Sequence, residues 1–201
     1  MNTETGFRIA FWVLVAGLAV MRLTFSLLAR RAGGRRLPGE TAIQREGKFV
    51  YAMRFVLFFL LIAWLVIYAV NPPWIQFLAL PFPAWLRWVG AGIGFASLAF
   101  WTWVQVILGK HWTPHLQLRQ EHLLVTSGPY ARIRHPLYSA MMGYVAGIAL
   151  LGATWFFILM WIVMAAGVID RVPKEEQMMI AEFGDEYREY MGNTWRFLPK
   201  L

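Results

Sequence analysis

The chain has 201 residues, of which 59% are hydrophobic and only 15% are charged, a balance far from that of soluble globular proteins. It contains no cysteine, which excludes disulfides, thiolate metal sites and cysteine nucleophiles. A formal net charge of +8 can indicate a nucleic-acid partner, but in a membrane chain it usually reflects cytoplasmic loops, so we expect no nucleic-acid binding. We therefore expect an all-α integral membrane protein that forms a single domain over residues 1–201.

Apolar segments predict about five transmembrane helices, the last two forming a tight hairpin, followed by a C-terminal amphipathic helix on the cytoplasmic side. The first segment contains Arg22 and ends in a basic flank, which is typical of a stop-transfer sequence and not of a cleaved signal peptide. The last apolar stretch, 136–169, is broken near "LGAT" into two arms of ~24 Å, short for ordinary spans. The predicted helices lie at about 7–29, 49–70, 85–108, 136–151 and 154–170.

Arginine and lysine predict how the helices are oriented. Segments 30–48, 110–134 and 171–200 hold six, four and five of the 19 basic residues, and with five helices all three segments fall on one side. The positive-inside rule makes that side the cytoplasm. Segment 71–84 and the "LGAT" turn carry no charge. We therefore expect a multi-pass protein with its N-terminus outside and its basic segments, with any catalytic face they form, in the cytoplasm. The membrane would be the inner (plasma) membrane if prokaryotic or the endoplasmic reticulum if eukaryotic.

The sequence after the hairpin predicts a surface helix. Pro173 suits its first turn, the two glutamates that follow suit its positive end, and Gly192 can end it. Apolar residues recur every three or four positions from Met179 to Tyr190 and mark one face for the membrane interface or for the protein.

The four histidines all lie between the third and fourth apolar segments, in a stretch that is broken by Pro114 and Gly128 and has one carboxylate nearby. A metal site needs several donors that converge on one point, so we expect no bound metal. The hydroxyl side chains of this stretch lack an evident base and acid pair, which argues against a hydrolase triad.

Charged side chains flank the hairpin. Arg134 and His135 precede it, and Arg171, Glu175 and Glu176 follow it. A zwitterionic small molecule needs such a matched set of charges. The alternative is that the cations mark a cytoplasmic flank and the glutamates begin a helix, and the residues alone leave both interpretations open.

Two sequence blocks carry a resemblance to a known family. "EHLLVTSGPYARIRHPLY" and "RVPKEEQMMIAEFGDEYREYMGNTWRFLPK", separated by the hairpin, resemble the isoprenylcysteine carboxyl methyltransferases. These are integral membrane enzymes that use S-adenosylmethionine and release S-adenosylhomocysteine. The resemblance covers roughly residues 111–200. It implies methyl transfer to the carboxylate of a lipid-tailed, isoprenoid or prenylcysteine-like substrate. The expected partners are this lipid or lipidated substrate and membrane lipids, without an obligate protein partner.

The resemblance also implies site residues within about 111–138 and 171–192. Arg171 is implied as the residue that positions the substrate carboxylate. His115 stands where the family often has glutamine, and Leu137 stands where a small polar residue is common. The charges of the cofactor add Arg134 as a donor to its carboxylate. The expected cofactor-binding residues are His115, His122, Leu123, Leu124, Val125, Tyr130, Arg134, His135, Pro136, Leu137, Tyr138, Glu175 and Glu176.

Three other functions stay open. Phospholipid or lipid-amine N-methyltransferases share the paired glutamates and an upstream Gly-x-Gly that Gly92 and Gly94 could echo, although small residues in membrane helices usually serve packing. Sterol-reductase-like enzymes that bind NADPH have a related "RHP" motif. A non-enzymatic membrane protein would need the paired charges only for topology.

Overall fold

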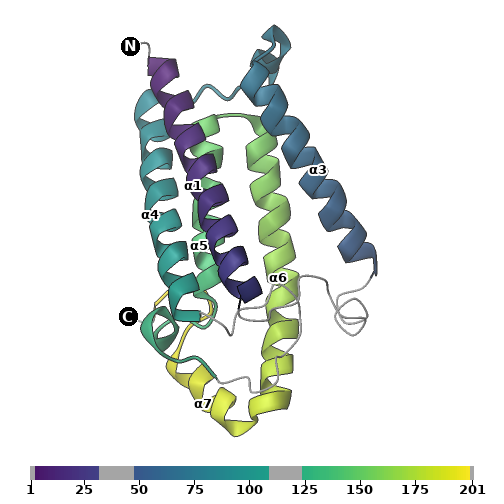
Figure 1. Cartoon of the computed structure of the whole chain (residues 1–201), viewed down its shortest axis with the longest axis vertical. Coiled ribbons are helices and arrows are strands. Elements are labelled where there is room, and N and C mark those ends of the chain that lie inside the picture. The colour runs from purple at the N-terminus through teal and green to yellow at the C-terminus, as the bar shows by residue number, and fades with distance from the viewer. Residues whose placement is uncertain (1–2, 32–47, 109–123, 200–201) are drawn as a thin grey trace.

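The structure, a computed structural model, describes residues 3–31, 48–108 and 124–199 of the chain. These residues form helices and, apart from two isolated bridges, no β-structure. The expected all-α fold is confirmed (Figure 1). In chain order the helices are α1 (Thr3–Arg31), α3 (Lys48–Val70), the 3-10 helix η1 (Pro73–Leu78), α4 (Ala84–Leu108), the 3-10 helix η3 (Gly128–Ala131), α5 (Pro136–Gly152), α6 (Trp155–Phe183) and α7 (Asp185–Asn193).

Helices α4 and α5 pack closely because both present glycine at their contact. A Cβ atom on Gly147 would lie 2.5 Å from the backbone nitrogen of Gly94, and one on Gly90 would lie 2.5 Å from Leu150 Cβ. Small residues allow membrane helices to approach in this way. Gly94 therefore serves packing, whereas Gly92 has open space around it.

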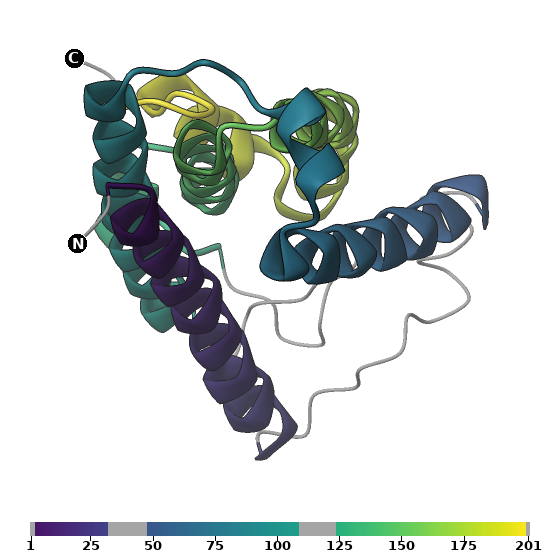
Figure 2. The same ribbon diagram turned by 90° about the horizontal axis from the view of Figure 1, so that it is seen from above.

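Aromatic side chains join α1, α3 and α6. The fully buried ring of Phe11 lies 4.5 Å from the Tyr68 ring and 5.3 Å from the Phe157 ring, measured between centroids. The Tyr144 hydroxyl of α5 donates to the Leu14 carbonyl of α1 at 3.0 Å. Away from this cluster, α3 diverges from the bundle, as both views show (Figures 1 and 2).

One end of the bundle, which we call the turn end, contains the start of α1, segment 71–84 and the α5–α6 turn. The Leu80 amide donates to the Ala153 carbonyl at 2.7 Å. Arg87 donates from Nε to the Leu151 carbonyl at 3.0 Å and forms an ion pair with Glu4 at 2.6 Å. The two uncharged segments of the sequence therefore lie together at one end.

Helix α6 differs from the prediction. It has 29 residues and continues through Pro173 to Phe183. The prediction of a separate helix that begins at Pro173 is therefore wrong. The chain breaks instead at Gly184, whose φ of 58° favours glycine, and the C-terminal amphipathic helix is the shorter α7.

Ion pairs one turn apart span the proline and help to explain its place inside the helix. Proline removes one backbone hydrogen bond. Asp170 pairs with Lys174 at 2.6 Å and Arg171 with Glu175 at 2.7 Å, each at an i, i+4 spacing that supports a helix. The sequence rule that places proline in the first turn of a helix takes no account of such ion pairs.

Helix α6 is longer than its hairpin partner α5, and the charged residues of α6 lie level with the start of α5 or beyond it. Helix α5 has 17 residues, about 25 Å, whereas α6 reaches about 43 Å. Arg171 is the seventeenth residue counted from Trp155, so it lies level with Pro136 at the start of α5. By length and composition α1, α4 and α6 can each cross a membrane, while α5 and residues 55–70 of α3 are shorter apolar helices. The chain is a multi-pass membrane protein.

Candidate functional site

The predicted polar residues converge at the end opposite the turn end, which we call the site end. It consists of the start of α5, residues 171–176 of α6, α7 and residues 194–198 (Figure 1). The polar segments before and after the hairpin contact each other directly, through Arg134 with Glu176 and Tyr138 with Glu175.

Glu175 is held through one of its two carboxylate oxygens. Its Oε1 accepts hydrogen bonds of 2.7 Å from the Tyr138 hydroxyl and of 2.7 Å from Arg171 Nε. Its Oε2 lies 3.8 Å from His135 Nδ1. Among the described residues no hydrogen bond reaches Oε2, so this oxygen can accept from the ammonium group of a ligand.

Glu176 is buried, with a relative exposure of 3%, and sits between two guanidinium groups. Arg134 Nε donates to its Oε1 at 3.1 Å, and Arg196 Nη2 donates to its Oε2 at 2.6 Å. These partners stabilise the charge of a carboxylate that is shielded from water. In return, the hydrogen bond and charge of Glu176 raise the pKa of Arg196.

Arg134 makes its bonds within the protein. Besides Glu176, its guanidinium donates from Nη1 to the carbonyls of Met191, at 2.9 Å, and of Thr194. Arg134 thereby ties the loop before α5 to the end of α7. The expected contact between Arg134 and the cofactor carboxylate competes with these bonds.

His135 is buried beside the two glutamates. Its carbonyl accepts from the Ser139 amide at 3.2 Å, which continues the first turn of α5, and Pro136 needs no hydrogen-bond partner for a backbone N–H. His135 Nε2 lies 3.4 Å from Glu176 Oε1, outside hydrogen-bonding geometry, and has no hydrogen-bond partner within residues 3–31, 48–108 and 124–199. A buried polar atom without a partner fits a site built to receive a polar ligand.

Tyr130 in η3 is half-buried and close to the same cluster. Its carbonyl accepts a hydrogen bond of 2.6 Å from the Tyr190 hydroxyl of α7. Burial, Tyr190 and the Glu175 charge raise the pKa of Tyr130. Its phenol therefore stays neutral over the physiological pH range.

The other expected contacts are placed less centrally. Leu124 and Val125 are half-buried in the segment before η3, and Leu137 is half-buried against the apolar core. His115, His122 and Leu123 lie outside the described residues.

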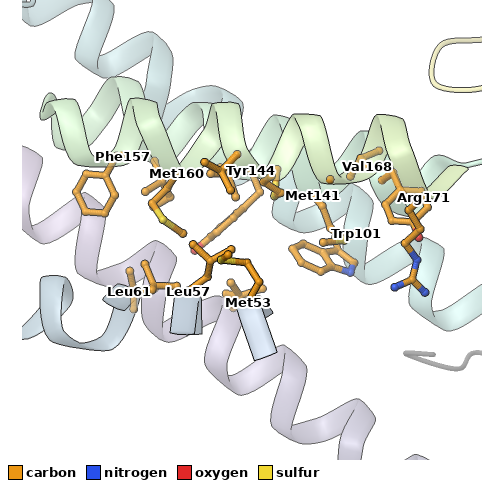
Figure 3. Close-up of a pocket in the computed structure, with 18 of the residues that line it drawn as sticks. Met53, Leu57, Leu61, Trp101, Met141, Tyr144, Phe157, Met160, Val168 and Arg171 are labelled. Atoms are coloured by element: carbon orange, nitrogen blue, oxygen red, sulfur yellow. The ribbon is translucent and has the colours of Figure 1, made fainter. Parts of the chain in front are cut away.

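A cavity of about 590 Å³ runs from the aromatic rings of Phe11 and Phe157 to Arg171 (Figure 3). Helices α1, α3, α4, α5 and α6 all contribute to its wall, which is mainly apolar. The charged side chains of the wall are gathered at the site end: Asp170, Arg171 and Lys174. Tyr138 also lines the cavity, so this residue and Arg171 belong both to the cavity and to the cluster around Glu175. Figure 3 shows Arg171 and Phe157 at opposite ends.

Sequence reasoning missed both the cavity and Arg196. The helices that form the cavity are apolar on most faces, so hydrophobic periodicity does not distinguish a cavity wall from a lipid-facing surface. Arg196 contacts Glu176 across 20 residues, and such a contact leaves no local pattern.

Comparison with known proteins agrees with this arrangement. Residues 90–181 match the model of the isoprenylcysteine carboxyl methyltransferase family. A protein of Oryza sativa named "Probable protein-S-isoprenylcysteine O-methyltransferase" is 25% identical over 195 residues, which cover 94% of this chain and 95% of the rice protein. The protein-S-isoprenylcysteine O-methyltransferase of Schizosaccharomyces pombe is 33% identical over 83 residues, 41% of this chain and 35% of the yeast protein.

The fold has a counterpart among solved structures. The structure of a eukaryotic intramembrane Ras methyltransferase, an isoprenylcysteine carboxyl methyltransferase, aligns with a TM-score of 0.55 at 20% sequence identity and covers 99% of this chain and 87% of the other. The helical arrangement is thus shared along nearly the whole chain. The chain is therefore similar to the isoprenylcysteine carboxyl methyltransferases over residues 90–181, and it shares its fold with one of them.

Proposed function

We propose that this protein is a membrane carboxyl O-methyltransferase that transfers a methyl group from S-adenosylmethionine to the carboxylate of a lipid-tailed substrate of the isoprenoid or prenylcysteine type. The observation that carries the proposal is an apolar cavity whose polar end is formed by Arg171 and Tyr138, both bound to Glu175. The reaction takes place at the cytoplasmic face, where the basic segments of the sequence lie.

The cavity suits a hydrocarbon tail. Its volume of about 590 Å³ lies in the range of small-ligand sites, and its wall is supplied by apolar side chains such as Leu57, Leu61 and Met160. Burial of apolar surface there contributes roughly 25 cal/mol per Å² to binding. An isoprenoid chain is apolar along its whole length and carries its reactive group at one tip, which matches a cavity with one polar end.

Arg171 is the residue that positions the substrate carboxylate. Its guanidinium lies at the polar end of the cavity, and the bond from Nε to Glu175 fixes its orientation. A planar guanidinium matches a carboxylate in shape and charge and holds it in one orientation. A carboxylate is already ionised at neutral pH, so none of the surrounding residues has to act as a general base.

The residues around Glu175 fit S-adenosylmethionine, which supplies an electrophilic methyl group on a positively charged sulfur. Glu175 Oε2 can accept from the ammonium of the cofactor. Tyr138 and His135 offer rings whose centroids are 5.8 Å apart, suited to a cationic or aromatic neighbour. We also propose contacts by the "HLLV" residues His122, Leu123, Leu124 and Val125, in keeping with the family resemblance.

The surroundings favour the transfer. A negative carboxylate and a positive sulfonium give a neutral ester and a neutral thioether, so charge is lost on the way to products. The apolar wall that meets Arg171 and Tyr138 keeps water away from the reacting groups, and a site poor in water favours the loss of charge.

Titration calorimetry of the detergent-solubilised protein tests the proposal. We expect S-adenosylhomocysteine to bind and NADPH not to bind. Binding of NADPH alone would favour a reductase, and a folded protein that binds neither compound would contradict the proposal. An amine lipid as the methyl acceptor is the remaining alternative, and the identity of the methylated product decides it.

A further inference from the structure

We infer that the C-terminal segment, residues 194–198, is a part of the cofactor site and that Arg196 is a positioning residue, which acts on the cofactor through Glu176 and His135. The inference rests on the proposed function. It concerns a segment that follows the matched family region, residues 90–181.

The backbone of this segment pairs with the loop before α5. The Arg134 amide donates to the Trp195 carbonyl at 2.7 Å, and the His135 amide donates to the Arg196 carbonyl at 2.9 Å. The Trp195 amide donates to the Arg132 carbonyl at 3.4 Å in return. The path of the main chain through His135 therefore depends on residues about 60 positions later.

Side chains add to this pairing. The Ser139 hydroxyl in the first turn of α5 donates to the Phe197 carbonyl at 2.5 Å. The Phe197 ring lies 6.3 Å from the His135 ring, whose other aromatic neighbour is Tyr138 at 5.8 Å. The segment thus contacts both the backbone and the imidazole ring of His135.

Arg196 pairs with the buried Glu176 carboxylate next to His135. Its Nε donates to both oxygens of Glu176, at 3.2 Å to Oε1 and 3.0 Å to Oε2, and its Nη2 donates to Oε2 at 2.6 Å. Contact with both oxygens fixes the plane of the carboxylate. Arg196 itself is half exposed, with 49% of its side chain accessible, whereas only 4% of the Glu176 side chain is. One exposed cation therefore orients a buried anion.

Loss of the contact between Arg196 and Glu176 should weaken cofactor binding. Without Arg196, the Glu176 carboxylate keeps Arg134 and gains freedom to turn toward His135 Nε2, now 3.4 Å away. A hydrogen bond donated by that nitrogen to the Glu176 carboxylate would draw the imidazole away from Glu175 Oε2, the oxygen proposed to accept the cofactor ammonium. The lipid cavity contains neither Glu176 nor Arg196 and should be unchanged.

The test compares Arg196→Gln with Arg188→Gln. Arg188 is an exposed arginine of α7 that pairs with Asp185 at 2.6 Å, far from Glu176 in the bonding network, and serves as the control. We expect Arg196→Gln to raise the Kd of S-adenosylhomocysteine and the KM for S-adenosylmethionine about tenfold, as loss of a charged hydrogen bond does. Turnover at saturating cofactor and the KM for the lipid should stay within about twofold of wild type. Arg188→Gln should change none of these.

Two further variants separate positioning from folding. Arg196→Lys keeps the charge but not the two-pronged contact, so its cofactor affinity should fall between those of the wild type and Arg196→Gln. The double variant Arg196→Gln with Glu176→Gln should bind no more weakly than Glu176→Gln alone, because Arg196 acts through Glu176.

The outcomes distinguish the inference from the proposed function. A wild-type protein that does not bind S-adenosylhomocysteine contradicts the proposed function. A wild type that binds, with an Arg196→Gln variant of equal affinity, overturns the inference alone. If Arg196→Gln does not fold, the affinity of Arg196→Lys for S-adenosylhomocysteine provides the test. An affinity equal to that of the wild type would then overturn the inference.

Discussion

The two ends of the bundle each contain a buried or half-buried arginine paired with glutamate, yet they differ in what surrounds the pair. At the turn end, Arg87 donates from Nε to the Leu151 carbonyl and from both Nη atoms to the Glu4 carboxylate. Its guanidinium lies 4.0 Å from the centre of the Phe7 ring. These contacts close the end of the hairpin onto the start of α1.

At the site end, Arg171 lines a cavity of about 590 Å³ and pairs with Glu175. Beside this pair lies a buried nitrogen of His135 that receives no hydrogen bond from the part of the chain that the structure describes. The comparison teaches that an arginine–glutamate pair in a membrane protein is not a functional signal by itself. Its meaning depends on an adjoining cavity and on polar atoms that the fold leaves without partners.

The sharpest way to test the comparison is to ask on which side of the membrane each end lies. Exposed Asn71 belongs to the turn end, and exposed Ser127 lies next to the site end. Since the chain has no cysteine, single cysteines can be introduced at either position. We expect Asn71→Cys to react with an impermeant thiol reagent in intact cells and Ser127→Cys to react only after permeabilisation. The reverse pattern would invert the proposed orientation.

Lysine substitutions compare the two arginines directly. Arg171→Lys keeps the charge but loses the planar contact, and a misplaced carboxylate should lower turnover about a hundredfold with cofactor affinity kept. Arg87→Lys should lower the melting temperature and leave the turnover of the folded protein unchanged. Loss of cofactor affinity in Arg171→Lys would move Arg171 into the cofactor site.

The role of Glu175 can be separated from that of the cavity. Glu175→Gln retains acceptors for Tyr138 and Arg171 but loses the charge that should bind the cofactor ammonium. We expect cofactor affinity to fall by between about tenfold and a hundredfold, with a smaller change in turnover at saturating cofactor. Calorimetry with S-adenosylhomocysteine measures the effect, and an unchanged Kd would remove Glu175 from the ammonium site.

The close contact of α4 and α5 supports both ends, and its glycines provide a matched pair of variants. A Cβ atom in Gly147→Ala would lie 2.5 Å from Gly94 N and 2.7 Å from Gly90 O, so the helices must move apart. We expect a loss of about 1–3 kcal/mol in stability, measured by unfolding in detergent. Gly92→Ala enters open space and should be neutral or slightly stabilising. Equal effects of the two substitutions would contradict the packing described.

The smallest effect is expected for the ion pair at the turn end. The Glu4 side chain is 54% exposed, and exposed ion pairs contribute about 0–1 kcal/mol. Glu4→Gln should therefore change the melting temperature little and leave methyl transfer unaltered. A marked loss of activity would show that the turn end takes part in function.

Sequence reasoning succeeded where local patterns carry the information. Continuous apolar segments predicted the helices. The charges before and after the hairpin were placed at its two ends, and the first 17 residues of α6, equal in number to those of α5, bring Arg171 level with Pro136. Those predictions depend only on helix rise and hydrophobicity.

It failed where distant residues decide the structure. Pro173 was expected to begin a helix, but ion pairs that span the proline support α6, which continues until Gly184. The contacts of Arg134 with Thr194, and of Glu176 with Arg196, join segments that are separate in the sequence. Hydropathy reports none of these contacts, because each depends on tertiary packing.

Methyl transfer in membranes that contain the protein tests the central claim most directly. Labelled S-adenosylmethionine is supplied with lipids of four kinds: prenylcysteines, free isoprenoid acids, fatty acids and phospholipid amines. We expect label on an isoprenoid-tailed carboxylate, released by mild base as a methyl ester is, and lost in Arg171→Lys. Base-stable label on an amine lipid, or no transfer to any carboxylate by a protein that binds S-adenosylhomocysteine, would contradict it.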